Sequence, residues 1–232
     1  MTKQAIRKQA IAEIFSKTNL NDLGFKYLKS KNGYKREFNG LTYSIGFGST
    51  RNNSLENTNI IIARTGVYDK KFAIWQQEKL GKRSGGRIGG GQIKNLFVDG
   101  PPYYDFDLTE NKEVQQSVIE EICTVIKSDV LNFFEICSST ENIIANIHLP
   151  CFSIWCVIEY LTFIGQEHKI NEVLDVYSKN YPTLMQEIKH YTNLVSEQGI
   201  ENNFRETYHN ETKRIALQIA NSLTLINKAK NG

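Results

Sequence analysis

The sequence is poor in the residues that cross-link secreted proteins or bind metal ions. It has four cysteines and four histidines in 232 residues. Cys123, Cys137, Cys151 and Cys156 include no CxxC pair, which is the spacing typical of zinc and redox sites. The histidines fit no HExxH or Cys/His ligand pattern. We therefore expect reduced, buried thiols, no bound metal and no other cofactor.

A long uncharged apolar run is also missing. The most apolar stretch, residues 143–165, contains Asn146, His148, Pro150 and Glu159, whereas a membrane helix needs about 20 mostly apolar residues. Residues 1–10 are polar and basic, unlike a secretory leader. These features predict a soluble, cytoplasmic protein without membrane contact.

Catalytic signatures are absent as well. The sequence contains no Gly-x-Ser-x-Gly elbow and no nucleophilic-cysteine signature. Asp69 followed by Gln77-Glu78-Lys79 only partly matches the strand of metal-dependent nucleases, because Gln77 is neutral. Asp99, Asp105 and Asp107 fit a solvated strand edge better than a metal site. The sequence therefore favours a protein that is not an enzyme.

Charge is unevenly distributed along the chain. The net charge is +3, but residues 1–107 hold 18 Lys and Arg against 9 Asp and Glu, and residues 108–232 hold 10 against 16. Such a polarity can steer an anionic partner to one face and a basic partner to another. The two halves can equally attract each other.

Periodicity predicts an antiparallel sheet in the first half. Residues 3–16 have the apolar spacing of an amphipathic helix. Apolar residues then alternate with polar ones, and Asn39-Gly40 is the strongest local hairpin signal. This pattern predicts about five strands, flanked by helices, at residues 34–38, 41–47, 59–68, 71–77 and 103–108.

The second half has the pattern of helices. Thr109 is a candidate cap, and apolar residues from Val114 to Phe134 predict one long helix. Short connections between the later helices favour a bundle. The predicted fold class is α+β, with a sheet domain at 1–138 and a helical domain or extension at 139–232. The later helices are expected near residues 141–148, 151–164, 168–179, 183–198 and 203–228.

The most unusual segment is KLGKRSGGRIGGGQIK, residues 79–94. It has six glycines, five basic residues and no acid. Gly81 and Gly86 have the spacing of a phosphate-binding P-loop, but Arg87-Ile88 stand where that motif needs Lys and Ser or Thr. Two interpretations stay open: a loop that wraps an anion with its backbone N–H groups, or a solvated connector between strands. The candidate anion- or partner-binding cations are Lys79, Lys82, Arg83, Arg87 and Lys94.

Trp75 precedes this segment on a predicted strand. It could offer a stacking surface for a nucleic-acid base beside the basic loop. It could equally pack beneath a helix, as strand aromatics commonly do. We include Trp75 among the candidate binding residues.

The first half resembles a known bacterial group. The residues concerned are Leu23-Gly24-Phe25-Lys26, the strands at 34–38 and 41–47, and Tyr104-Asp105-Phe106-Asp107-Leu108 before a long helix. Over about residues 5–135 they resemble the domain of unknown function 4304 family. The resemblance implies an α+β sheet domain of bacterial origin, in a setting such as immunity or defence, where proteins act by binding. It implies no catalytic residues, and it does not cover the glycine-rich segment.

Three functional hypotheses follow. The first is a non-enzymatic binding protein, of immunity or defence type, that binds a partner protein through a charged face. The alternative is a nucleic-acid or nucleotide-phosphate binder, with or without catalysis, that uses residues 79–94. The third is a homo-oligomer formed through the C-terminal helices.

Overall fold

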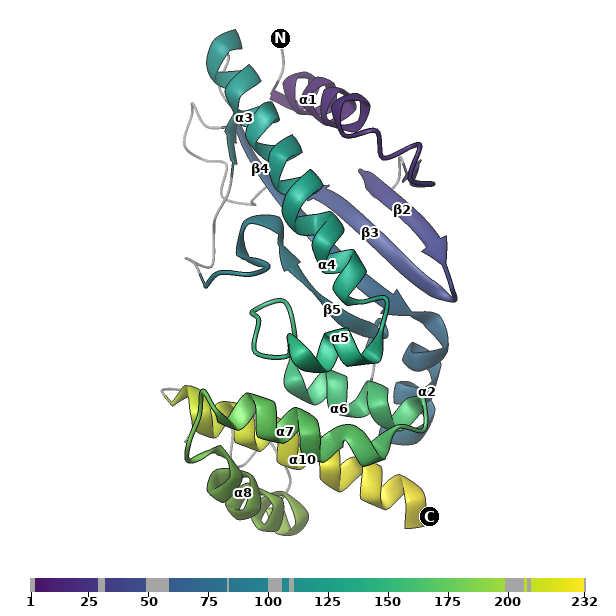
Figure 1. Ribbon diagram of the computed structural model, residues 1–232, viewed down its shortest axis with the longest axis vertical. Helices are drawn as coiled ribbons and strands as arrows, with labels where there is room; N and C mark the ends of the chain where they lie inside the picture. Colours follow the sequence, from purple (N-terminus) through teal and green to yellow (C-terminus); the bar gives the residue numbers. More distant parts are fainter. Residues whose placement is uncertain are drawn as a thin grey trace. The chain divides into compact units, whose positions relative to one another are not determined.

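The computed structural model describes residues 3–28, 32–48, 59–82, 84–99, 106–108, 111–198, 207 and 210–231 (Figure 1). These residues form two compact units. The first comprises described residues within 1–68, 90–138 and 149–151, and the second those within 69–89, 139–148 and 152–232. The division into a sheet domain at 1–138 and a helical domain or extension at 139–232 stays a prediction.

The predicted antiparallel sheet is confirmed. Its strand order is β1-β2-β3-β4-β5, and the sixth strand, β6, pairs with β4. The pairs β1–β2, β2–β3 and β4–β6 are antiparallel. The strands are β1 (Lys26–Leu28), β2 (Gly33–Phe38), β3 (Leu41–Gly48), β4 (Asn59–Asp69), β5 (Arg87–Gln92) and β6 (Phe106–Leu108).

The β2–β3 hairpin turns where Asn39-Gly40 predicted it. Both residues have positive φ, 50° and 80°, as a two-residue hairpin turn of the primed type requires. The turn fixes the register, so that side chains alternate between the two faces of β3. Tyr43, Ile45 and Phe47 are buried on one face, and this face is the core side of the sheet.

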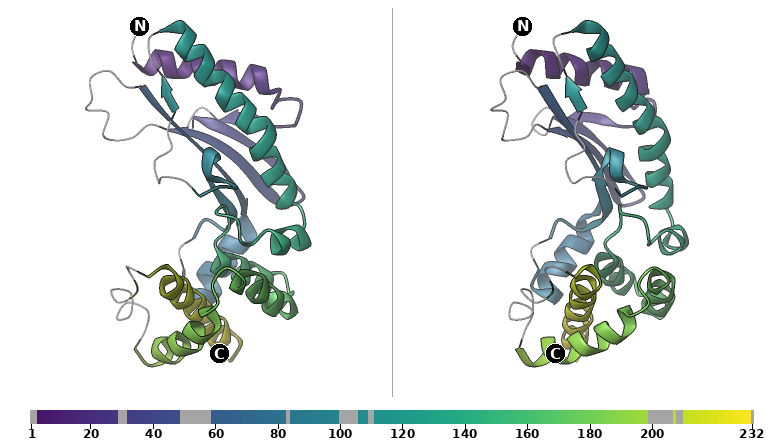
Figure 2. Two further views of the ribbon diagram at one scale, coloured as in Figure 1. Left: turned by 60° about the vertical axis from the view of Figure 1, so that its left-hand side comes forward. Right: turned by 90° about the vertical axis from the view of Figure 1, so that its left-hand side faces the viewer.

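Helices cover the core side of the sheet (Figure 2). They are α1 (Lys3–Thr18), α3 (Lys112–Val125) and α4 (Leu131–Ile136), the last two joined by a π-helical turn. Tyr34 Oη donates a 3.1 Å hydrogen bond to the Ile11 carbonyl of α1. The ring of Phe134 in α4 meets Tyr43 edge-on, with 5.2 Å between ring centroids. The predicted long helix is therefore confirmed, and its packing surface is the sheet.

The start of α3 shows why the helix begins there. Asn111 is its N-cap, and the Asn111 side chain accepts hydrogen bonds from the backbone N–H groups of Glu113 and Val114. The predicted cap, Thr109, lies outside the described residues. The first three positions of the predicted strand at 103–108 also lie outside them, and β6 is its described part.

The strand predicted at residues 71–77 is wrong. These residues belong to helix α2 (Lys70–Leu80), which the Asp69 carboxylate caps by accepting from the N–H groups of Lys71 and Phe72. Phe72, Gln76 and Leu80 are its buried residues, one per helical turn. Gly81 ends the helix in the left-handed conformation, at φ 66°. The capping carboxylate and the four-residue spacing outweigh the weak alternation of the segment.

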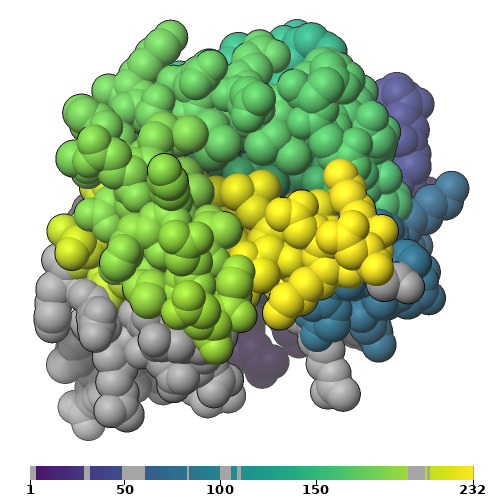
Figure 3. All heavy atoms as spheres, turned by 90° about the horizontal axis from the view of Figure 1, so that it is seen from below, coloured from purple at the N-terminus to yellow at the C-terminus, as the bar shows by residue number. Residues whose placement is uncertain are grey.

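The second unit contains the predicted C-terminal helices and, in addition, α2. Helix α10 packs against α8, α6 and α2 (Figure 3). Phe72 and Trp75 of α2 meet Tyr160 and Phe163 of α6 in one aromatic cluster. No helix in the described part of the chain is long and apolar enough to span a membrane. The remaining helices are α5 (Thr140–Ala145), α6 (Ile154–Phe163), α7 (Ile170–Ser178), α8 (Leu184–Gln198) and α10 (Glu211–Asn231).

Candidate ligand groove

The glycine-rich segment is not one continuous loop. It contains the end of α2, a connection, strand β5 and a short 3-10 turn, Ile93–Asn95. A Cβ at Gly86 would lie 2.0 Å from the Asp69 carbonyl oxygen, and a Cβ at Gly90 would lie 2.4 Å from that of Thr65. At these positions glycine permits the close approach of two backbone segments.

Lys82 is the counter-ion of a buried carboxylate. Its Nζ pairs with Glu159 Oε1, and the Glu159 side chain is only 1% exposed. Gln76 Nε2 donates to Glu159 Oε2 at 2.7 Å, and Ser222 Oγ donates to Glu159 Oε1. We call Gln76, Lys82, Glu159 and Ser222 the Glu159 cluster. It connects α2 and the start of the glycine-rich segment to α6 and α10, which is a structural role for a residue predicted to bind anions.

Lys94 also forms an ion pair with an acidic residue of the same chain, Glu121. Its Nζ lies 2.7 Å from Glu121 Oε1 and 4.1 Å from the ring centroid of Phe106, and its side chain is 13% exposed. Lys94 belongs to the first unit, whereas Lys79, Lys82 and Arg87 belong to the second. The predicted cations are therefore divided between the two units.

The other candidates differ in exposure. Trp75 lies on helix α2 instead of the predicted strand, and it is half-buried against Phe72 and Phe163, each at 6.0 Å between ring centroids. Lys79 and Arg87 are exposed. Arg83 lies outside the described residues.

Ionisable groups elsewhere do not form a reactive centre within the described residues. Burial and the nearby Glu159 charge raise the pKa of the Cys156 thiol to about 11, and burial raises the pKa of Cys137 well above its ordinary value. Thiols with such pKa values are mostly protonated at neutral pH. Among these residues no three His, Cys, Asp or Glu side chains gather as a metal site would. Asp99 and Asp107 are exposed, and Asp105 lies outside the described ranges.

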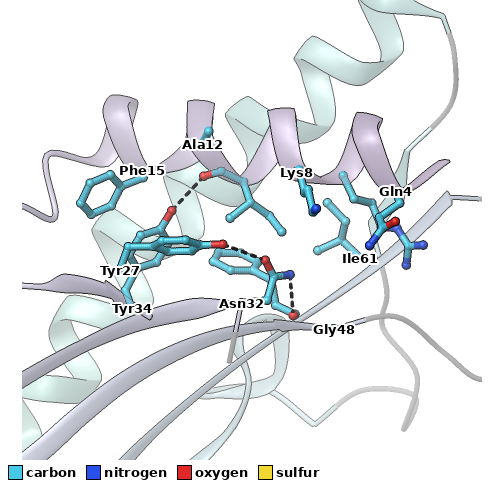
Figure 4. A pocket seen from close by; sticks show the side chains of 12 residues that line it. Gln4, Lys8, Ala12, Phe15, Tyr27, Asn32, Tyr34, Gly48 and Ile61 are labelled. Carbon is cyan, nitrogen blue, oxygen red and sulfur yellow. Dashed lines mark hydrogen bonds between the residues drawn. The ribbon is translucent and has the colours of Figure 1, made fainter. Parts of the chain in front are cut away.

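A hollow lies where the sequence interpretation placed no site, between α1 and the sheet (Figure 4). Its volume is about 1040 Å³. Phe15, Tyr27 and Tyr34 lie together at one end, and Gln4 and Ile61 at the other. We call it the α1 groove. The residues that line it are Gln4, Arg7, Lys8, Ile11, Ala12, Phe15, Tyr27, Asn32, Tyr34, Phe47, Gly48 and Ile61.

The floor of the α1 groove is aromatic and held in place by several contacts. Phe15 and Tyr34 stack with 4.4 Å between centroids, and Phe47 meets Tyr34 edge-on at 6.0 Å. Tyr34 Oη donates to the Ile11 carbonyl. Burial, followed by the neighbouring Tyr27, raises the pKa of Tyr34 above its ordinary value. The Tyr34 hydroxyl is therefore neutral, and its hydrogen bond holds α1 on the sheet.

The rim of the α1 groove is cationic. Arg7 and Lys8 line it, and none of the twelve lining residues is acidic. No carboxylate of the described residues forms an ion pair with either cation. Asn32 Nδ2 donates to the Phe47 carbonyl at 3.1 Å, and Asn32 Oδ1 accepts from Tyr27 Oη at 3.2 Å. The groove therefore combines an apolar floor with a positive rim whose two cations pair with none of the described carboxylates, a combination that favours an anionic ligand with apolar groups.

One sequence signal for the groove existed. Gln4, Lys8, Ala12 and Phe15 follow the spacing of one helix face and lie beside the fully buried stripe that predicted α1. Ala12 is exposed and Phe15 is half-buried. Two apolar side chains that α1 leaves partly exposed beside Gln4 and Lys8 indicate a second contact surface.

Comparisons of the chain with protein-family models, with curated proteins and with solved structures find no match. The resemblance to the domain of unknown function 4304 family therefore stays a prediction. The residues of the α1 groove are the basis on which a function can be proposed.

Proposed function

We propose that the protein is a non-enzymatic binding protein that holds an acidic, partly apolar segment of a partner protein in the α1 groove. The observation that supports this proposal is the pairing of an aromatic floor with Arg7 and Lys8 in a hollow whose described lining residues include no acid. Pockets for small molecules and cofactors have volumes of about 300–1,000 Å³, mostly apolar walls and a few polar groups. At about 1040 Å³ the groove is large enough for several residues of a peptide.

A protein segment suits the groove better than a nucleic acid does. Bases stack on free aromatic faces, but Phe15 and Tyr34 stack on each other, 2° from parallel. A phosphodiester chain also needs a row of cations. The alternative site at residues 79–94 has Lys82 and Lys94 paired with Glu159 and Glu121, so its exposed described cations are Lys79 and Arg87.

The biological setting is part of the same proposal. An immunity- or defence-associated protein of a bacterial cytoplasm would act by occupying a surface of its partner, and an acidic segment of that partner would meet Arg7 and Lys8. Complementary charge raises the association rate and suppresses wrong partners more than it raises affinity. We therefore expect fast, salt-sensitive association.

The test is a recovery experiment with matched charge reversals. The tagged wild type, the pair Arg7→Glu with Lys8→Glu, and the pair Lys79→Glu with Arg87→Glu are each recovered from the native host at low and at moderate salt. Co-purifying proteins and nucleic acids are then identified. We expect a stoichiometric protein that is lost from the groove variant and kept by the other pair.

Two results would count against the proposal. A partner protein kept by the groove variant would place the interface elsewhere. Nucleic acid that is lost with salt, and lost again from the Lys79 and Arg87 pair, would favour the second candidate function. Salt dependence of that binding would then report the number of phosphates contacted.

A further inference from the structure

The α1 groove opens beside an edge of the sheet. Strand β1 is at one end of the strand order and pairs only with β2 among the described strands. Its central residue, Tyr27, is 45% exposed and also lines the groove. An edge strand has backbone N–H and C=O groups that can pair with another chain.

The register shows which backbone groups of β1 point outward. The N–H of Phe47 donates to the Asn32 carbonyl, so Asn32 and, two residues on, Tyr34 direct their backbone groups toward β3. Gly33 and Lys35 consequently direct theirs toward β1, opposite Leu28 and Lys26. Tyr27 is in a non-hydrogen-bonded pair, and its N–H and C=O therefore point away from β2.

The side chains on this edge face the groove. Tyr27 is directly opposite Tyr34, and their ring centroids are 5.3 Å apart on the α1 side of the sheet. A strand added beyond β1 would place every second side chain on that same side. Those side chains would meet Phe15 and Tyr27 first.

We propose that the partner segment binds as an added β-strand that pairs with the main chain of Tyr27 and directs alternate side chains into the α1 groove. This inference rests on the proposed function and specifies its mode of binding. Main-chain pairing provides affinity and the groove provides specificity, as in other strand-addition sites.

Charge and spacing define the segment further. Lys8 lies roughly 10 Å from Phe15 along α1, at about 1.5 Å per residue. An extended strand covers that distance in about three residues. Because only every second side chain of a strand faces the groove, the segment has an apolar residue opposite Tyr27 and an acidic residue about two or four positions away. Lys26, exposed on the same edge strand, favours an acidic partner and disfavours pairing with a second copy of this chain.

The probe is a phage-displayed library of random 12-residue peptides. Selection on the full-length wild type, with removal of phage that bind the Arg7→Glu and Lys8→Glu variant, yields a groove-specific peptide. The synthetic peptide is then measured by fluorescence polarisation. We expect it to contain an apolar residue and an acidic residue in the predicted spacing.

Two substitutions at Tyr27 separate the backbone from the ring. Tyr27→Thr removes the ring and keeps the N–H, whereas Tyr27→Pro removes both. Proline is tolerated on an edge strand where the N–H faces solvent, and the β1–β2 hydrogen bonds come from the neighbouring residues. Circular dichroism and thermal unfolding check that both variants are folded. We expect Tyr27→Pro to bind about tenfold more weakly than Tyr27→Thr, the effect of losing a main-chain hydrogen bond.

The peptide provides a second, independent readout if Tyr27→Pro does not fold. Single N-methylation along the peptide should weaken binding at every second position, because only alternate N–H groups of an added strand face β1. Weaker binding after N-methylation at consecutive peptide positions, or unchanged binding at all positions, would refute strand addition. Equal affinity of Tyr27→Pro and Tyr27→Thr for the peptide would also refute strand addition, while the proposed function would stand. If the wild-type chain forms a dimer that Tyr27→Pro dissociates, the occupant of the edge is a second copy of this chain and not a partner protein. Failure to select any groove-dependent peptide would refute both proposals.

Discussion

Replacing Lys82 with methionine would leave the buried Glu159 carboxylate without its counter-ion. Methionine keeps most of the volume of the lysine stem but not its charge. Removing one partner of a buried ion pair usually costs about 3–5 kcal/mol. Here Gln76 and Ser222 still donate to Glu159, and the Lys82 side chain is 26% exposed, so solvent screens part of the loss. We expect Lys82→Met to lower the free energy of unfolding by about 2–3 kcal/mol.

The double variant distinguishes the charge from the packing. Lys82→Met combined with Glu159→Met removes the pair together, and apolar replacement of a whole buried pair is often neutral. We expect the double variant to recover most of the loss. Lys71→Met, at an exposed position of the same α2 helix, is the matched control and should stay within about 0.5 kcal/mol of the wild type.

Urea unfolding followed by tryptophan fluorescence is the assay, because both tryptophans, Trp75 and Trp155, belong to the second unit. The signal thus reports the unit that contains the Glu159 cluster. A loss below about 1 kcal/mol relative to Lys71→Met would refute the buried-pair reasoning, since that is within the range of exposed pairs. A double variant no more stable than Lys82→Met would refute it too.

Two further predictions concern the first unit. Gly90 has a φ of 140°, and a Cβ there would lie 2.4 Å from the Thr65 carbonyl oxygen, so Gly90→Ala should lower the free energy of unfolding by about 3 kcal/mol. Gly91 has open space around it, so the control Gly91→Ala should be nearly neutral. Equal losses of stability for the two variants in urea unfolding would contradict the close contact at Gly90. Tyr34 has its pKa raised by burial, so the folded state holds the phenolic proton more tightly than the unfolded chain does. Its contribution to stability is complete below the ordinary pKa of 10.0 and is lost as the pH rises above it. Tyr34→Phe should therefore flatten the alkaline loss of stability above about pH 10, and an unchanged pH dependence would contradict this.

Local chemistry made much of the sheet predictable. Asn39-Gly40 specifies a turn that only a few residue types adopt, and the alternation on both sides of it fixes which face of β3 is buried. The later helices were predictable because their apolar residues recur at helical spacing and short connections separate them. These features depend on neighbours in the sequence, and the structure confirms them.

Two elements were not predicted, for different reasons. Strand β5, Arg87–Gln92, is rich in glycine and has low intrinsic strand propensity; it forms where Gly90 comes close to the backbone of Thr65. Helix α2 was mistaken for a strand because its short segment alternates weakly, and the capping role of Asp69 went unnoticed.

The site was the hardest part to predict. Lys82 and Lys94 look like free cations in the sequence, and only the fold shows that Glu159 and Glu121 neutralise them. Conversely, Arg7 was one cation among several on a predicted amphipathic helix. Its place on the rim of a groove depends on how α1 lies over the sheet, which no local pattern specifies.

The division of the chain also bears on how it folds during synthesis. The chain passes between the two units five times, so neither unit is a continuous stretch that a ribosome could release as a finished piece. Lys82 and Ser222, which meet in the Glu159 cluster, are 140 residues apart. At about 5–20 residues per second, α2 leaves the ribosome roughly 7–28 s before its partner in α10. Through that interval the buried side of α2, which includes Phe72, Gln76 and Leu80, lacks its contact with α10, and this is the stage at which a chaperone would be most useful to this protein.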